Sequence, residues 1–442
     1  MNGVCAVVVV LQWHITILKI CWIRKSIVTW ILARLFQRRF SLAKLAICGG
    51  DKIINHKFPQ FPKVNQEMEN IIMEVLHSGL WGYDTERDNE DNYLKKMERE
   101  ISSFMGCNYT LGVSSCSGAL DIAIRSLGIR NGDEVIVSPY TYFASAACIM
   151  NSGGIPIFAD IDCKTWNISP DEIIKKITPR TKAIVVVHFG GVSANMDEIM
   201  GIAQKYNLKV IEDAAHSFGA KWRDQFTGTI GDIGCFSFQQ AKNVIAGEGG
   251  AFVTDNREFF EKAYSYMMLG RKYKEKKWYQ HHCLGWNYRM TQFQAALVYS
   301  QLKDIKTMED VRRKNAQKIC KELSNIEGLI PVLGEEEEAQ RVYHILGIRY
   351  KKEKWNNLSK KRFIYALNAE GIPCYGGYEY PLYRNPIFDK ELNSDMFCKE
   401  AEELCQQAIW LPGKILLGDS TCTDNIISAF VKIYHNLNEL VK

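Results

Sequence analysis

The chain has 442 residues, of which 47% are hydrophobic and 24% charged, so it can bury one large core and a smaller one. Its 55 basic and 50 acidic residues leave a formal charge of +5, which over this length gives no reason to expect a nucleic-acid partner. The 14 cysteines show neither CxxC spacing nor a dense framework, so we expect free thiols in a cytoplasmic protein. The run His281-His282-Cys283 lacks a fourth ligand at short spacing, so we expect no metal site.

Residues 1–44 form an apolar and basic extension whose role the sequence leaves open. The apolar stretches 4–13 and 27–33 are separated by His14, Lys19, Arg24 and Lys25, so no clean run of about 18 apolar residues could span a membrane. No small-residue cleavage site follows a compact apolar core. A basic interfacial helix, a weak anchor and a spurious upstream extension are the alternatives. Membrane contact is expected only if this segment belongs to the mature protein.

From residue 45 the pattern is that of a globular α/β protein. It predicts helices over 67–78 and 91–105, the first ended by Gly79. Strands are then predicted over 134–138, 155–160, 183–188, 209–212, 233–238 and 250–254, with helices over 118–126, 143–151 and 196–205 between several of them. Continuous Val/Ile runs separated by helices indicate strands buried on both faces of a mainly parallel sheet.

After residue 290 the pattern changes to that of a smaller α+β domain. One or two long helices are predicted over 292–325, a strand over 341–350, a helix over 360–370, an irregular aromatic loop over 375–388, and helices over 396–408 and 423–436. We therefore predict a large α/β domain over 45–300, which includes the N-terminal helices, and a small C-terminal domain over 301–442.

Ligands of doubly wound sheets bind beyond the carboxyl ends of the strands, where helix N-termini converge. Two candidate groups follow early strands. The serine-rich turn 114–118 opens a helix, and Ser117 and Gly118 are candidates for holding a phosphate; an ordinary serine N-cap is the alternative. Tyr142 follows the strand that ends near Pro139 and could stack on a planar cofactor, or be a core tyrosine.

Two further groups follow later strands. Asp213 ends an apolar strand, where a carboxylate could keep a pyridine nitrogen protonated or simply cap the next turn. Ala215 could pack on the ring and His216 could reach a cofactor oxygen. Ser237 ends another strand, and Lys242 follows five residues later, before a glycine-rich turn. A lysine placed there could form an imine with a cofactor and then move a proton. No single element is specific, whereas their order and spacing are.

Taken together, these residues resemble the DegT–DnrJ family of pyridoxal-phosphate sugar aminotransferases. The motifs that carry the resemblance are the runs 211–216, 236–250 and 285–290, and the likeness extends from about residue 45 to the C-terminus. The resemblance implies the type I aminotransferase fold, with a large, mainly parallel sheet of the seven-stranded type, and pyridoxal 5′-phosphate (PLP) as cofactor. Where relatives usually have Gly-Thr after the first strand, this chain has Cys116-Ser117.

The resemblance also implies the role of each site residue. Lys242 would be the Schiff-base lysine and Asp213 the partner of the pyridine nitrogen. His216 would lie near the phenolic oxygen, with Ala215 and Tyr142 against the ring. Ser117, Gly118 and Ser237 would contact the phosphate. Asn287 would reach toward the neighbouring subunit's cofactor, which implies a homodimer with shared active sites.

Within the family, the pair Gln239-Gln240 and the loop 380–386 look most like the branch of scyllo-inosose aminotransferases and 3-amino-5-hydroxybenzoate synthases. The implied acceptor is a keto sugar or keto cyclitol, and the implied donor is glutamine or glutamate. The alternatives are a pyridoxamine-phosphate-dependent sugar dehydratase, in which histidine replaces the lysine, and a non-catalytic regulatory or membrane-tethered relative. A nucleotide-binding dehydrogenase is disfavoured because no GxGxxG follows the first strand.

Overall fold

The computed structural model describes residues 44–83, 91–274, 277, 279–332, 338–388 and 396–441. The predictions made for the N-terminal extension therefore lie, apart from Lys44, outside the described residues. Within the described ranges, no helix combines the length and apolarity needed to cross a membrane. The described cysteines are all free thiols.

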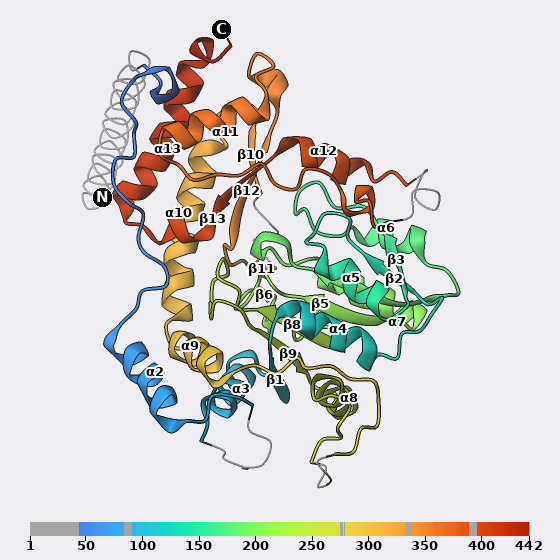
Figure 1. Cartoon of the computed structure of the whole chain (residues 1–442). Coiled ribbons are helices and arrows are strands. Elements are labelled where there is room, and N and C mark those ends of the chain that lie inside the picture. The colour runs from blue at the N-terminus through green and yellow to red at the C-terminus, as the bar shows by residue number, and fades with distance from the viewer. Residues whose placement is uncertain are drawn as a thin grey trace, which may run out of the picture.

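A seven-stranded sheet forms the centre of the larger part of the molecule (Figure 1). Its strands are β1 (Tyr109–Val113), β2 (Glu134–Val137), β3 (Ile155–Phe158), β4 (Thr181–Val187), β5 (Lys209–Asp213), β8 (Ile233–Ser237) and β9 (Gly250–Thr254). They lie in the order β1-β9-β8-β5-β4-β2-β3. All neighbouring pairs from β8 to β3 are parallel, and β9 runs antiparallel to both β1 and β8. The predicted mainly parallel sheet is confirmed.

Helices cover this sheet on both faces, as the continuous apolar runs predict. Val135 and Val137 pack with α4 (Cys116–Ser126), α5 (Ala144–Asn151) and α8 (Arg257–Met267). Ile136 points the opposite way and packs with α6 (Pro170–Lys176) and α7 (Met196–Tyr206), because successive strand residues face opposite sides. At the β9–β8 end of that second face lie α3 (Tyr93–Met105) and α9 (Gln292–Leu302), with α2 (Gln66–Ser78) outside them. The pattern did not predict α6 or α8.

A second, antiparallel sheet of order β10-β12-β13 forms the centre of the C-terminal part. Its strands are β10 (Leu329–Pro331), β12 (Ile345–Tyr350) and β13 (Ala408–Pro412), and they pack with α10 (Ile305–Leu323), α11 (Lys360–Ala369) and α13 (Ser420–His435). The helix predicted over 396–408 is α12 (Lys399–Gln407), and residue 408 already belongs to β13. The prediction was wrong there because β13 is too short for alternation to distinguish it from a helix end. The small hairpin β6 (Lys221–Trp222) and β7 (Gln225–Phe226) pairs with β11 (Ala339–Gln340).

The start of the described chain packs on this second core, although it lies in the range predicted for the large domain. Leu45 and Ile54 are buried beside α10, α11 and α13. The carboxylate of Glu370 accepts hydrogen bonds from the backbone of Ala46 (2.9 Å) and Ile53 (3.1 Å) and pairs with the buried amine of Lys432 (2.9 Å). Figure 1 shows this segment running beside α13 before it descends to α2. The exact boundary between two domains at residue 300 stays a prediction.

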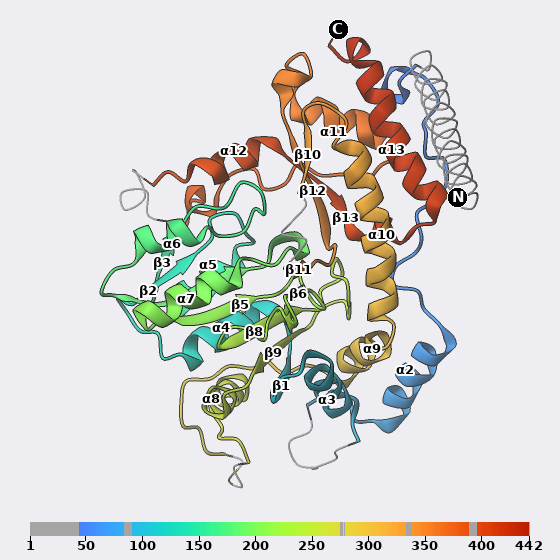
Figure 2. The same cartoon turned by 180° about the vertical axis from the view of Figure 1, so that it is seen from behind.

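The C-terminal part meets the large sheet at the carboxyl ends of its strands, as both views show (Figure 2). Asp160, just after β3, accepts hydrogen bonds from the first-turn amides of α12 at Glu400 (2.8 Å) and Ala401 (3.0 Å). The backbone of Leu382 donates to that of Pro139, just after β2 (2.8 Å). These contacts hold α12 and the loop at Leu382 against the sheet edge where ligands of parallel sheets bind.

Candidate active site

A cavity of about 390 Å³ lies at the carboxyl ends of β4, β5 and β8, which end in Val187, Asp213 and Ser237. Seven of the predicted site residues line it: Ser117, Tyr142, Asp213, Ala215, His216, Ser237 and Lys242. They come from separate loops that meet only because parallel strands end at one edge of the sheet. The predicted residues Gly118 and Asn287 do not line the cavity.

Asp213 is a buried carboxylate held by two hydrogen bonds. Ser145 donates its hydroxyl to Oδ2 (2.7 Å), and the Ala215 amide donates to Oδ1 (3.2 Å). Burial raises the pKa of Asp213, and the bonds from Ser145 and Ala215 and the charge of Lys242 oppose that rise. A buried anion that faces a cavity and keeps acceptor capacity suits a cationic N–H group.

Lys242 carries the amine on the same cavity. It follows β8 in a loop without regular structure and is half-buried. Burial lowers the pKa of its ammonium group, against the opposing influence of Cys116 and Asp213. A lower pKa leaves more of the amine neutral, and the neutral amine is the form that attacks a carbonyl carbon.

His216 is held in one tautomer by the backbone. Its Nδ1 accepts the Gly190 amide (3.2 Å), so the proton of the neutral ring is on Nε2. The ring of His344 packs against it with centroids 4.3 Å apart. Burial, together with the charge of Lys242, keeps the pKa of His216 well below its usual value. The neutral ring can therefore donate one hydrogen bond from Nε2.

The serine-rich turn forms the N-terminus of α4. Ser115 is the N-cap and accepts the Gly118 amide on its Oγ (3.1 Å), so the serine N-cap exists alongside the cavity-lining Ser117. A Cβ on Gly118 would approach the Tyr288 ring to 2.9 Å, so this glycine is needed for packing. Gly250 at the start of β9 lies so close to the turn that a Cβ there would come within 2.5 Å of the Cys116 nitrogen. The turn is thus tightly positioned between α4, β9 and the cavity.

Tyr142, Ser237 and Ala215 complete the predicted lining. Tyr142 lines the cavity and is 67% exposed, so it is not a core tyrosine, which was the alternative interpretation of the sequence. Ser237 is buried at the end of β8, and Ala215 lies two residues beyond Asp213. Asn287 lies outside the cavity of its own chain, where its Oδ1 accepts a hydrogen bond from Arg289 Nε (2.9 Å).

Three residues near the cavity were missed by the sequence reasoning. Ser145 lies inside a predicted helix, one turn after Thr141, whose hydroxyl it contacts at 3.0 Å. Tyr378 lines the cavity from the aromatic loop, and His344 lies just before β12. Only a knowledge of which helix and which C-terminal loop face Asp213 and His216 could identify them.

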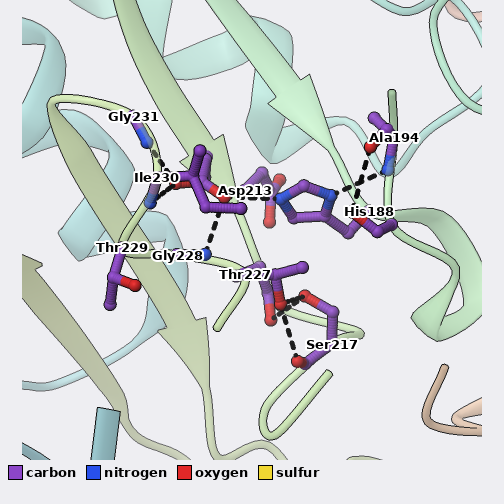
Figure 3. A network of polar contacts seen from close by, with 12 residues as sticks. His188, Ala194, Asp213, Ser217, Thr227, Gly228, Thr229, Ile230 and Gly231 are labelled. Carbon is purple, nitrogen blue, oxygen red and sulfur yellow. Dashed lines mark hydrogen bonds and ion pairs between the residues drawn. The ribbon is translucent and has the colours of Figure 1, made fainter. Parts of the chain in front are cut away.

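Glu212, next to Asp213 on β5, points to the opposite face and is fully buried. Its oxygens accept the amides of Gly228, Ile230 and Gly231 at 2.6–2.7 Å and contact His188 Nε2 at 2.8 Å. Figure 3 shows His188 and the 228–231 turn on either side of Asp213. The Ala194 amide donates to His188 Nδ1 (3.1 Å), which leaves Nε2 as the donor to Glu212. The network fixes the end of β5, and so the place of Asp213.

The fold and this cavity define a cofactor-dependent α/β enzyme with a lysine amine and a buried carboxylate on one pocket. Residues 64–430 match the model of the DegT/DnrJ/EryC1/StrS aminotransferase family, and the chain belongs to that family. It is an aminotransferase of a family that depends on PLP, and its fold is the type I aminotransferase fold.

Three similar proteins illustrate the relationship. A protein of Streptoalloteichus tenebrarius with the provisional name L-glutamine:3-amino-2,3-dideoxy-scyllo-inosose aminotransferase is 32% identical over 90% of this chain and 99% of its own. The structure of an aminotransferase from Psychrobacter cryohalolentis has a TM-score of 0.79 and 30% identity, covering 86% of this chain and all of its own. The structure of 3-amino-5-hydroxybenzoic acid synthase has a TM-score of 0.76 and 26% identity, covering 85% of this chain and 98% of its own.

The residues present fit PLP. Asp213 offers a buried acceptor for a pyridinium N–H, and Lys242 offers an amine for the aldehyde carbon. The helix N-terminus at Ser117 suits a phosphate, because first-turn amides and the helix dipole both favour an anion. An acceptor, an amine and an anion site therefore share one cavity.

Proposed function

We propose that the chain transfers an amino group from glutamine or glutamate to a keto sugar or keto cyclitol, by a ping-pong reaction in which Lys242 moves the proton. The observation that carries the proposal is the placement of Lys242 and Asp213 on one cavity with the serine turn. The acceptor class is supported by the 32% identity, over nearly the whole length of both chains, to a protein named for a scyllo-inosose derivative.

Each lining residue has a proposed task in this reaction. When bound, PLP withdraws electrons from the carbon that carries the amino group. Asp213 holds the ring nitrogen protonated, and His216 Nε2 donates to the phenolic oxygen. Nζ of Lys242 would take up the proton that leaves the donor's α-carbon. Tyr142 and Ala215 would hold the ring in place, while Ser117 and Ser237 would hold the phosphate.

We further propose a homodimer in which Asn287 reaches the phosphate bound by the partner subunit. In its own chain Asn287 lies outside the cavity and is turned toward Arg289, so a role in binding requires a second copy. Sedimentation equilibrium should give twice the mass of one chain. Asn287→Ala should weaken PLP binding without altering the pocket of its own chain.

The direct test is a screen of amino donors and keto acceptors on the purified protein, following the conversion of bound PLP to its amine form by absorbance. We expect glutamine or glutamate to convert the cofactor and a keto cyclitol or keto sugar to convert it back. Lys242→Ala should bind PLP without covalent attachment and lose turnover. Wild-type turnover by Lys242→Ala would refute the proposal, as would a protein that binds no PLP, which would favour the regulatory alternative. A deoxygenated, unaminated product would favour the dehydratase.

A further inference from the structure

Lys242 lies near the tip of a loop whose base is closed by backbone pairing. At the base the Phe238 amide donates to Gly249 and the Gln240 amide to Gly247, each at 2.9 Å. Residues 241–246 between these pairs form turns and bends rather than a helix or strand. The Lys242 amide donates to the Gln239 carbonyl (2.9 Å), so the path of the chain just beyond Lys242 depends on how side chains hold residues 243–245.

The first of these side-chain contacts comes from α10. Asn243, the next residue after Lys242, donates its Nδ2 to Oε1 of Glu309 (2.9 Å). The same oxygen pairs with Arg312 one turn further along α10. All three residues are buried: Asn243 is 8% exposed, Glu309 is 5% exposed and Arg312 is 1% exposed. Neither Glu309 nor Arg312 lines the cavity, and Asn243 connects them to the loop that carries Lys242.

The second contact comes from α9, which precedes α10 by a short corner. Gln301 accepts the Ile245 amide on Oε1 (3.1 Å) and donates Nε2 to the Ile245 carbonyl (2.7 Å). A side-chain amide that bonds both the backbone N–H and the backbone C=O of one residue fixes that residue as pairing with a neighbouring strand would. The corner between α9 and α10 thus holds the tip at positions 243 and 245, on one side of Lys242.

The charge of Glu309 makes this contact specific. Burial raises the pKa of Glu309, and its pairing with Arg312 and hydrogen bond from Asn243 oppose that rise. A buried ion pair contributes little net stability compared with apolar packing, and its best-supported use is to fix one arrangement of neighbouring elements. Here the arrangement it fixes is the one between α10 and the loop that carries Lys242.

We propose that Glu309 is a positioning residue for Lys242: through Asn243 it sets where the lysine amine reaches into the cavity. The inference rests on the proposed function, because it assumes that Lys242 bonds to PLP. Glu309 touches neither cofactor nor substrate in this proposal. It acts by limiting the conformations of the loop tip, so that the amine meets the cofactor in one geometry.

The test exchanges the amide of Asn243 and the carboxylate of Glu309. Asn243→Asp places two carboxylates against each other, whereas Asn243→Asp combined with Glu309→Gln restores a hydrogen bond of reversed polarity and keeps one negative charge beside Arg312. Apoprotein is mixed with PLP, the covalent adduct is trapped with borohydride at set times, and attachment to Lys242 is measured by mass spectrometry. We expect Asn243→Asp to slow attachment by about tenfold, within the range for contacting residues, and the double variant to recover to within about threefold of wild type.

Controls separate this effect from lost stability and from failure of the proposed function. Glu370→Gln breaks another buried pair, with Lys432, and neither residue lines the cavity, so the change should lower thermal stability without changing the attachment rate. If Asn243→Asp does not fold, Gln301→Met removes the Ile245 contacts instead and should also slow attachment. Wild-type rates in Asn243→Asp, a double variant no faster than that single variant, or a wild-type rate in Gln301→Met would overturn the inference. A wild-type protein that never attaches PLP would instead refute the proposed function.

Discussion

The hydrogen bond from Ser145 to Asp213 gives the sharpest prediction about the site. Ser145→Ala removes a 2.7 Å bond that only the ionised carboxylate of Asp213 receives fully. Burial raises the pKa of Asp213, and this bond is the strongest influence that opposes the rise. Its removal therefore raises that pKa further and favours the neutral acid at a given pH.

The size of the effect follows from the strength of such bonds. A hydrogen bond to a charged group contributes about 1.5–3 kcal/mol, which is about a 10- to 100-fold change in the ratio of ionised to neutral Asp213. Because only the ionised form can pair with a protonated pyridine nitrogen, PLP affinity falls as the pH drops through the pKa of Asp213. In Ser145→Ala that fall should begin at higher pH and, on the acidic side, affinity should be weaker by about the same factor.

The assay is the PLP dissociation constant measured from acid to neutral pH by cofactor absorbance. Ser126→Ala is the matched control, because it deletes a buried helix hydroxyl that bonds only the Ile122 carbonyl (2.6 Å). Its pH profile should overlie that of the wild type. If Ser145→Ala and Ser126→Ala have the same profile, the bond does not hold Asp213 in its charged form, and the reasoning is refuted.

Three further predictions concern buried carboxylates. A carboxyl group whose pKa is higher in the folded than in the unfolded protein stabilises the fold below its unfolded pKa, and this contribution is lost as the pH rises through its folded pKa. At neutral pH, Asp213→Asn should therefore stabilise the apoprotein in thermal melts, while turnover falls by about 100-fold or more. Glu212→Gln turns an amide N–H₂ toward backbone N–H donors, so it should lower the free energy of unfolding, measured in urea, by about 3–5 kcal/mol. A smaller loss of stability than in a surface Glu→Gln variant would contradict this. Glu370→Gln should speed amide hydrogen exchange over residues 45–54, whose backbone it holds, and unchanged exchange there would show that Lys432 alone suffices.

Some site residues could be found from the sequence because each follows a strand that the apolar pattern predicts. Asp213 and Lys242 follow apolar runs at fixed spacing, and in a parallel sheet the carboxyl ends of such runs share one edge. The same logic gives the serine turn and Tyr142. Short or charged elements were not found: α6 has seven residues, and β13 follows a helix without a break. Their place depends on pairing with distant strands rather than on local preference.

By itself, then, the sequence determined six of the seven strands of the large sheet, the order of the chemical groups along the chain and their family, because local apolar patterns and spacing carry that information. The tertiary structure alone decided which distant groups support them: Ser145 beneath Asp213, His344 against His216, and Glu309 against the residue after Lys242. These pairs lie 68, 128 and 66 positions apart in the chain, respectively. At such separations no periodic pattern records contact, and only the packing of two cores against one sheet edge brings the pairs together.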